Sequence, residues 1–382
     1  MEIPGREEKS LIKYRLKKII FNLVILIISI IFILVILEIA VRIFTKPVYP
    51  ILRTDRRVGT IHQKNFSGQI WNEESKSWNY IKTNSLGYLG EEVKREKPAE
   101  SIRIAVLGDS MTEGLQVDYY NNFVSKLNTA LSLDNGEGEK RFEILNFGVG
   151  GSGTFLQYQT YKNNIIPLNP EAVFVVFSSN DYSDNLNKSS FDLENYAGEK
   201  TRRIWLKDFL LKFQLPKFSF VKLQYNLFFL EILNKFGLYE LSDNLRDYRR
   251  GFNITESQED YEYTFSIIRK FKELCQINNT EFVMIVMPLE RDYQEKDKWQ
   301  SNNGIVKMIE FLEKEQIKYL NPCPALYEAR KKYSVEECFN FGCQAGHLTE
   351  LGHQEFAKIL YQYIKDLLYN NFRNEISRFE AR

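Results

Sequence analysis

Apolar positions fall into one long run near the N-terminus and several short runs further along the chain. Residues 19–37 carry no charge, and only Asn22 and Ser29 among them are polar. As a helix this run is about 28 Å long, close to the hydrocarbon thickness of a bilayer. A buried core helix is the alternative, but such helices are rarely apolar on every side. We predict a transmembrane anchor that is not cleaved, because residues 38–42 (Glu-Ile-Ala-Val-Arg) lack the small-residue pattern of a cleavage site.

The orientation of this anchor follows from its basic flanks. Basic residues occur on both sides of the run and are denser before it. Positive charge favours the cytoplasmic side, so we expect a short cytoplasmic tail and a body that is periplasmic or extracellular. The basic residues are Arg6, Lys9, Lys13, Arg15, Lys17 and Lys18 before the run, and Arg42, Lys46, Arg53, Arg56 and Arg57 after it.

Beyond residue 100, short apolar runs alternate with longer amphipathic stretches such as 122–131 and 261–277. The short runs are rich in β-branched or aromatic residues and end in small polar residues. Buried strands that alternate with helices are typical of an α/β fold with a parallel sheet covered on both faces. The five predicted strands are 102–107, 142–146, 172–177, 282–287 and a weaker one at 318–320.

Two segments depart from this pattern. Residues 44–100 have no long periodic stretch, and we predict an irregular lead-in with a short hairpin around 66–81. Residues 186–255 form a helical insertion that is dense in aromatic residues. Core packing is its default role, and a lid over an apolar groove or a surface on the bilayer are the alternatives.

Composition narrows the chemistry. The chain has 51 Lys and Arg against 50 Asp and Glu, a formal charge of +1 that argues against nucleic-acid binding. The apolar share of 44% is that of a globular protein rather than of a disordered one. The chain contains only three histidines, His62, His347 and His353, so any histidine chemistry depends on a short list.

Polar clusters follow the predicted strands, where α/β sheets place their ligands. Ser110 lies in a Gly-Asp-Ser turn after the first strand, which is either a capped turn or an exposed nucleophile. A glycine-rich loop at 146–154 follows the second strand and allows close approach of a ligand. Asn180 follows the third strand and could donate to an oxyanion. His347 precedes a C-terminal helix and is a candidate general base.

In this order, the four clusters resemble the SGNH hydrolase family of GDSL-type esterases and lipases, over about 102–367. The run Thr83–Tyr88 is similar to the one that precedes the domain in membrane-anchored bacterial members. The resemblance implies a three-layer α/β/α fold with a flavodoxin-like sheet. Together with the apolar run and the irregular lead-in, it sets the predicted domain bounds at 1–18 for the tail, 19–43 for the anchor, 44–100 for the lead-in, 101–372 for the hydrolase-like domain and 373–382 for a second tail.

The resemblance also assigns roles to residues. Ser110 would be the nucleophile and His347 the base. The backbone N–H groups of Ser110 and Gly151 and the side chain of Asn180 would form the oxyanion hole. No cofactor and no metal are expected. The resemblance leaves structural roles to the remaining three residues: His353 packs, while Asp109 and Asp181 brace loops.

One departure from the family pattern concerns the acid of the catalytic triad. The family places an aspartate two or three residues before the histidine, and Ala345 and Gln344 occupy those positions here. We consider Glu350 and Glu113 as weak candidates for the missing carboxylate, or a backbone carbonyl that leaves a Ser–His dyad. Loss of the third member costs up to about four orders of magnitude in rate, so a slow or degenerate site is an open alternative.

The four cysteines suggest a disulfide if the body is exported. We hypothesise a Cys338–Cys343 or a Cys323–Cys343 bridge that holds the histidine loop, with Cys275 further back. Cys338, Cys343 and His347 have some resemblance to a metal-binding spacing, but no paired two-residue cysteine motif supports it.

The expected function is that of a membrane-anchored esterase that cleaves an O-acyl ester of a cell-envelope glycan or lipid. Its partners would be the acylated substrate and the membrane, and not nucleic acid. An acyltransferase that uses the same acyl-serine is one alternative. A catalytically inactive module that binds acylated glycans or lipids is another.

Overall fold

The computed structural model describes residues 6–44, 51–55, 57–72, 74–134, 141–189, 257–288, 297–333, 339–340 and 346–366. The predicted insertion 186–255 lies outside these ranges except for its first residues, which end helix α5 (Asp181–Ser189). Cys338 and Cys343 also lie outside these ranges, so the disulfide hypothesis stays a prediction. The domain bounds stay predictions as well.

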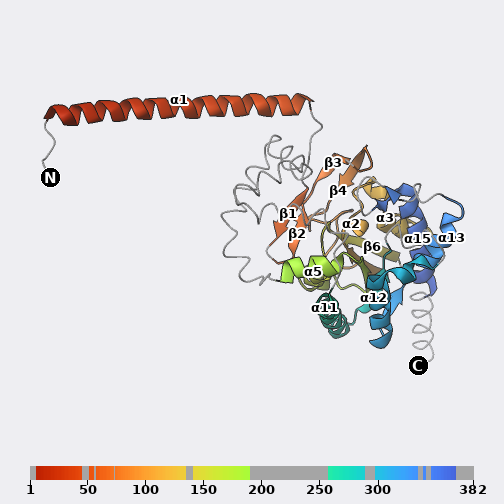
Figure 1. Cartoon of the computed structure of the whole chain (residues 1–382). Helices are drawn as coiled ribbons and strands as arrows, with labels where there is room; N and C mark the ends of the chain where they lie inside the picture. The colour runs from red at the N-terminus through yellow and green to blue at the C-terminus, as the bar shows by residue number, and fades with distance from the viewer. Residues whose placement is uncertain are drawn as a thin grey trace.

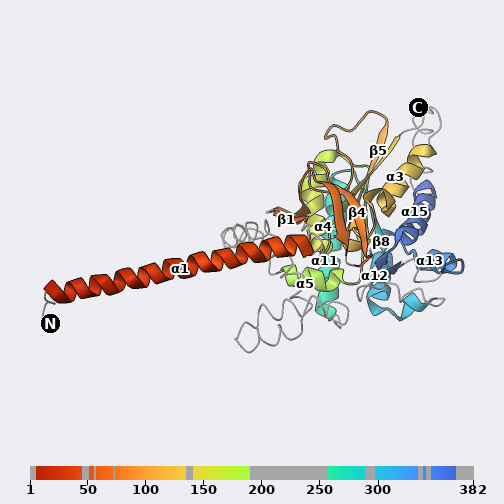
Figure 2. The same ribbon diagram turned by 90° about the horizontal axis from the view of Figure 1, so that it is seen from above.

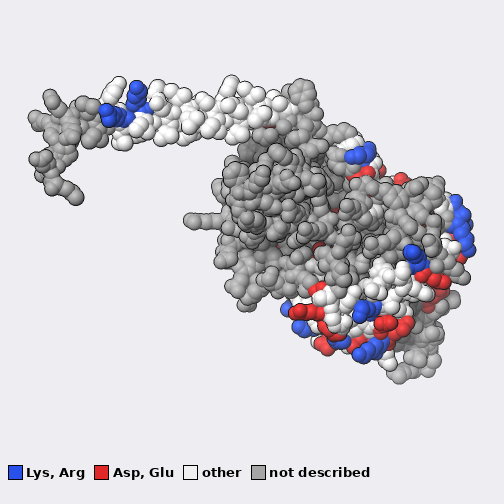
Figure 3. All heavy atoms as spheres, viewed as in Figure 1, with Lys and Arg blue, Asp and Glu red and all other residues white. Residues whose placement is uncertain are grey.

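Helix α1 (Arg6–Phe44) extends away from the rest of the protein (Figure 1). Its stretch Lys13–Ala40 is long and apolar enough to cross a membrane, and none of it is buried. The space-filling view shows Lys and Arg near one end of the described helix and no charge along most of its length (Figure 3). Length and composition alone fit either a membrane anchor or a signal sequence.

The central sheet has five strands in the order β6-β5-β7-β8-β9, and every neighbouring pair is parallel. This order is the flavodoxin-like one. The second strand, β6, is added on one side of β5, and the later strands β7, β8 and β9 are added in turn on the other side. The strands lie at the five predicted places and confirm the α/β fold. Their bounds are β5 Ser101–Gly108, β6 Arg141–Gly148, β7 Ala172–Phe177, β8 Glu281–Val286 and β9 Lys318–Leu320.

Helices cover both faces of the sheet, so its central strands are buried on both sides. In β5, for example, Leu107 packs into one apolar cluster and Val106 into the other. The two layers of helices are visible on either side of the sheet (Figure 2). One layer contains α4 (Thr154–Thr160), α11 (Gln258–Ile277) and α12 (Asn303–Lys314), and the other contains α3 (Phe123–Leu133), α13 (Cys323–Arg330) and α15 (Glu350–Ile364).

The lead-in forms two antiparallel hairpins, of which the second confirms the one predicted around 66–81. Ile51, Ile70, Ile81 and Leu89 form a small core beneath these hairpins. Other lead-in side chains, such as Tyr88, belong to the large cluster on the sheet. The lead-in is therefore packed onto the α/β domain. Its strands are β1 Leu52–Asp55, β2 Gly59–His62, β3 Ser67–Asn72 and β4 Ser77–Lys82.

Candidate active site

Ser110 is the first residue of the short helix α2 (Ser110–Glu113), directly after strand β5. The side chain of Asp109 caps this helix by accepting a hydrogen bond of 2.9 Å from the backbone N–H of Met111. The turn is held tightly against strand β6. A Cβ on Gly148 would lie only 2.4 Å from the backbone nitrogen of Glu113, so only glycine fits there. The turn leaves Ser110 half-buried at the carboxyl edge of the sheet.

His347 reaches this serine from the short strand β11 (His347–Leu348), which pairs with β10 (Phe339–Asn340) just before helix α15. The distance from His347 Nε2 to Ser110 Oγ is 2.8 Å. The sequence predicted this pair, and the fold brings its two members together across 237 residues of chain.

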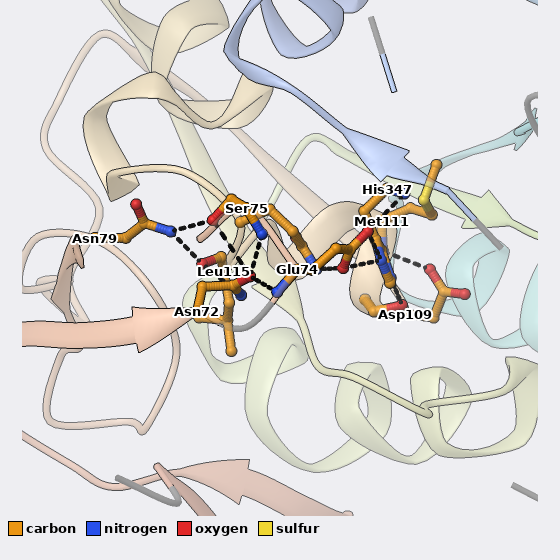
Figure 4. Close-up of polar contacts among 10 residues, drawn as sticks. Asn72, Glu74, Ser75, Asn79, Asp109, Met111, Leu115 and His347 are labelled. Atoms are coloured by element: carbon orange, nitrogen blue, oxygen red, sulfur yellow. Dashed lines mark hydrogen bonds and ion pairs between the residues drawn. The ribbon is translucent and has the colours of Figure 1, made fainter. Parts of the chain in front are cut away.

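The carboxylate on the other side of the imidazole comes from Glu74, in the turn between β3 and β4 of the lead-in. Its Oε2 lies 2.7 Å from His347 Nδ1, and its Oε1 accepts a hydrogen bond of 3.1 Å from the backbone N–H of His347 (Figure 4). A carboxylate at this position places the ring proton on Nδ1, so Nε2 is free to accept the hydroxyl proton of Ser110. Glu74, His347 and Ser110 thus form one continuous hydrogen-bonded chain.

Glu74 remains the carboxylate form in this setting. Burial acts to raise the pKa of Glu74, but the hydrogen bonds and charge of His347, with a smaller hydrogen bond from Gln116, outweigh it and leave the pKa below its ordinary value. The Gln116 Nε2 donates to Glu74 Oε2 at 3.2 Å. An ionised Glu74 can therefore stabilise the positive charge that His347 acquires when it takes a proton.

Two side-chain amides, one buried and one half-buried, hold the turn that carries Glu74. The side chains of Asn72 and Asn79 converge on the backbone carbonyl of Leu115 and donate to it at 3.2 and 2.9 Å (Figure 4). Asn72 Oδ1 also accepts the backbone N–H groups of Glu74 and Ser75. Leu115 and Gln116 lie just beyond Gly114, the C-cap of α2, so Glu74 and Ser110 are fixed to the same short segment.

The two candidate acids that the sequence suggested do not meet His347. Glu113 is buried and its Oε1 lies 2.7 Å from Nε2 of His62, a contact that joins the lead-in to helix α2. Glu350 is in the first turn of α15, and its side chain forms an ion pair of 3.7 Å with Lys126. Both suggestions were wrong, because the acid comes from a segment that precedes His347 by 273 residues.

The other two predicted site residues, Gly151 and Asn180, follow strands β6 and β7, which flank β5 in the sheet. Gly151 is in the loop after β6 with φ of +66°, and a Cβ there would meet no atom within 4 Å. Asn180 follows β7, and its Nδ2 donates to Asp109 and Asp184, each at 3.1 Å. An amide nitrogen has only two hydrogens, so Asn180 can reach a substrate oxygen only by releasing one of these carboxylates.

Three residues have the structural surroundings that the sequence analysis expected. Asp181 braces the glycine-rich loop by accepting hydrogen bonds from Thr154 and Gln157. Burial, with the charges of Asp109 and Asp184, raises the pKa of Asp181 well above its ordinary value. Burial also raises the pKa of Asp109. His353 is buried, accepts the backbone N–H of Phe123 through Nδ1, and has its pKa lowered by burial to about 3. It is neutral at ordinary pH.

Sequence comparison finds no family model and no curated protein that matches the chain. Among solved structures, the chain is similar to an acetylxylan esterase from Geobacillus stearothermophilus. The TM-score is 0.42 and the identity 11%, over 69% of this chain and 94% of that one. A second acetyl xylan esterase has a TM-score of 0.41 and 11% identity over 69% and 100%. An alpha/beta hydrolase from the metagenome of Lake Arreo, Spain, has a TM-score of 0.39 and 13% identity over 67% and 91%. Likenesses of this degree carry no argument about function, so the chemistry of the site is inferred from its own side chains.

Proposed function

We propose that this chain is a membrane-anchored serine esterase that cleaves an O-acyl ester of a cell-envelope glycan or lipid. One observation carries the proposal: Glu74, His347 and Ser110 form a continuous chain with contacts of 2.7 and 2.8 Å. A serine hydroxyl becomes a useful nucleophile when an adjacent base, itself oriented by a third group, accepts its proton.

The reaction follows from the positions of these groups. Ser110 Oγ attacks the acyl carbon while its proton passes to His347 Nε2, and the carbonyl electrons move onto the oxygen. The backbone N–H groups of Ser110 and Gly151 would stabilise that oxyanion, joined by the amide of Asn180 once it releases Asp109 or Asp184. The imidazolium then gives its proton to the departing alkoxide, which leaves as an alcohol, and an acyl-Ser110 remains.

Water completes the cycle by the same route in reverse. His347 Nε2 takes a proton from a water molecule as its oxygen attacks the acyl carbon, and the same nitrogen returns the proton to Ser110 Oγ as the acid departs. Glu74 keeps its negative charge through both halves and stabilises the charged imidazole each time. A hydroxyl of an acceptor in place of water would make the chain an acyltransferase.

The alternative of an inactive binding module rested on the missing aspartate before His347. Glu74 supplies a carboxylate at the same nitrogen of the ring, and this observation favours an active enzyme. The side chains of Glu74 and His347 are only 11% and 15% exposed, so water competes weakly with their hydrogen bond.

Labelling with a fluorophosphonate probe tests the proposal. The full chain in detergent should be labelled, Ser110→Ala should not be, and His347→Ala should be labelled far more slowly. The same samples should hydrolyse p-nitrophenyl acetate in the same order, and product analysis with an acceptor glycan separates hydrolysis from transfer. A folded parent that neither reacts with the probe nor turns over the ester would contradict the proposal.

A further inference from the structure

The hairpin of β3 and β4 has one face buried and another exposed. Ile70 and Ile81 point into the small core beneath it. Side chains alternate along a strand, so the intervening residues of both strands share the opposite face. In the register of this hairpin Trp71 pairs with Trp78, and Gln69 pairs with Tyr80. Two tryptophans and a tyrosine therefore lie side by side on the outer face.

Tyr120 extends this aromatic face. Its ring stacks on that of Tyr80, with centroids 6.1 Å apart and an interplanar angle of 10°. Trp71 and Trp78 meet edge to face at 5.7 Å. We call these four residues, Trp71, Trp78, Tyr80 and Tyr120, the hairpin surface. Trp78 is 40% exposed and Tyr120 is 59% exposed, so this cluster of rings presents apolar area to its surroundings.

The position of the hairpin surface in the chain limits its distance from helix α1. That helix ends at Phe44, and the described chain resumes at Ile51, which packs beneath the hairpin against Ile70 and Ile81. Seven Cα–Cα steps span at most about 25 Å. Figures 1 and 2 agree in placing the C-terminal end of α1 on the side of the domain that carries the hairpins.

We propose that the hairpin surface lies in the headgroup region of the bilayer in which α1 anchors the protein. The site would then act on esters carried by lipids of that membrane. The inference rests on the proposed anchor and esterase. Tryptophan and tyrosine are the residues that gather at membrane interfaces, because an apolar ring and a polar edge suit the two sides of that boundary. The hydroxyl of Tyr80 is at the exposed edge of the hairpin, where it lies 2.6 Å from Ser67 Oγ.

Contact with the membrane would bring the active site to its substrate. Glu74 is three residues after Trp71 and four before Trp78, which corresponds to about 10–13 Å of strand. The carboxylate of this turn touches His347. A hairpin held at the headgroups would therefore keep the catalytic groups within reach of an ester at the surface of the bilayer, and a substrate in the same membrane would not need to leave it.

Fluorescence quenching tests the proposal in the full chain reconstituted in phosphatidylcholine vesicles. The sequence contains Trp71, Trp78, Trp205 and Trp299. One variant keeps only Trp78, with phenylalanine at the other three positions. The matched control keeps only Trp299, which lies in the short 3-10 helix Lys298–Ser301 just before α12. Lipids brominated near the headgroup end of the acyl chain should abolish most of the Trp78 emission and leave the Trp299 emission unchanged.

Two further measurements separate the possible outcomes. Trp78→Ser with Tyr120→Ser should lower, several-fold, the ratio of turnover of a vesicle-embedded long-chain ester to that of soluble p-nitrophenyl acetate. Trp78 emission that brominated lipid does not change overturns the proposal. If a soluble acetylated oligosaccharide then alters that emission, the hairpin surface binds glycan instead. Quenching does not depend on catalysis, and labelling of Ser110 in the same vesicles reports separately on the esterase and on folding.

Discussion

Replacing Glu74 by glutamine should impair catalysis more than removing the side chain altogether. In the parent, the carboxylate accepts the proton of His347 Nδ1 at 2.7 Å. A glutamine amide in that place can donate its own proton to Nδ1, which shifts the ring proton to Nε2. Ser110 Oγ, 2.8 Å from Nε2, would then face a donor instead of a base. Glu74→Ala leaves the tautomer free to interconvert and should be less harmful.

The size of the effect follows from the tautomer and the lost charge. A wrong tautomer in a serine triad costs about four orders of magnitude in kcat, which is about 5.5 kcal/mol of transition-state stabilisation. We expect a loss of about 10³–10⁴-fold in kcat/KM for Glu74→Gln and about 10²–10³-fold for Glu74→Ala. Glu74 also accepts hydrogen bonds from Gln116 and from the backbone of His347. Their loss should lower the free energy of unfolding by about 1–2 kcal/mol.

The loss of kcat/KM in Glu74→Gln and in Glu74→Ala is measured by hydrolysis of p-nitrophenyl acetate over a range of pH, together with the rate of fluorophosphonate labelling. Glu350→Gln is the matched control, because it removes the same charge from an exposed acid that does not reach His347. It should keep the activity of the parent. The reasoning is refuted if folded Glu74→Ala and Glu74→Gln keep kcat/KM within about threefold of the parent, since an effect that small is below 1 kcal/mol.

Three other changes test the framework around the site. Asn79→Ala removes a donor to the carbonyl of Leu115 at 2.9 Å. It should lower kcat more than it changes KM and destabilise the fold by about 1–2 kcal/mol. An unchanged kcat would show that the turn keeps its position without this hydrogen bond. Gly148→Ala places a Cβ 2.4 Å from a backbone nitrogen of the nucleophile helix, so urea unfolding should show a loss of about 1–3 kcal/mol and labelling of Ser110 should slow. Burial lowers the pKa of His353 to about 3, so the unfolded chain binds more protons below pH 6.5 and the folded state loses about 1.4 kcal/mol per pH unit as pH falls towards 3. The stability difference between the parent and His353→Gln should accordingly shift against the parent by about 2 kcal/mol from pH 7 to pH 5, and parallel pH profiles would contradict the neutral, buried assignment.

The elements whose signals are local could be predicted from the sequence. Short buried strands, each ending in a small polar cluster, indicated a parallel sheet, and the structure places the five strands at those positions. Ser110 and His347 were predicted from the order of four local clusters and their resemblance to a family, and the structure brings the two side chains within 2.8 Å of each other. Ser110 sits in a turn with its own capping residue, and His347 is one of only three histidines. The apolar run of α1 was evident because a lipid-compatible helix requires an uninterrupted stretch of apolar residues.

The third member of the site depended on tertiary structure. Glu74 is in the turn of a hairpin, where an acidic residue is ordinary, and nothing in its neighbours marks it for catalysis. It reaches His347 because Asn72 and Asn79 fix the turn to Leu115 and because the lead-in packs onto the sheet. A carboxylate acts on an imidazole through space at 2.7 Å. Periodicity and local motifs carry no information about which of the 50 acidic residues the folded chain will bring to that position.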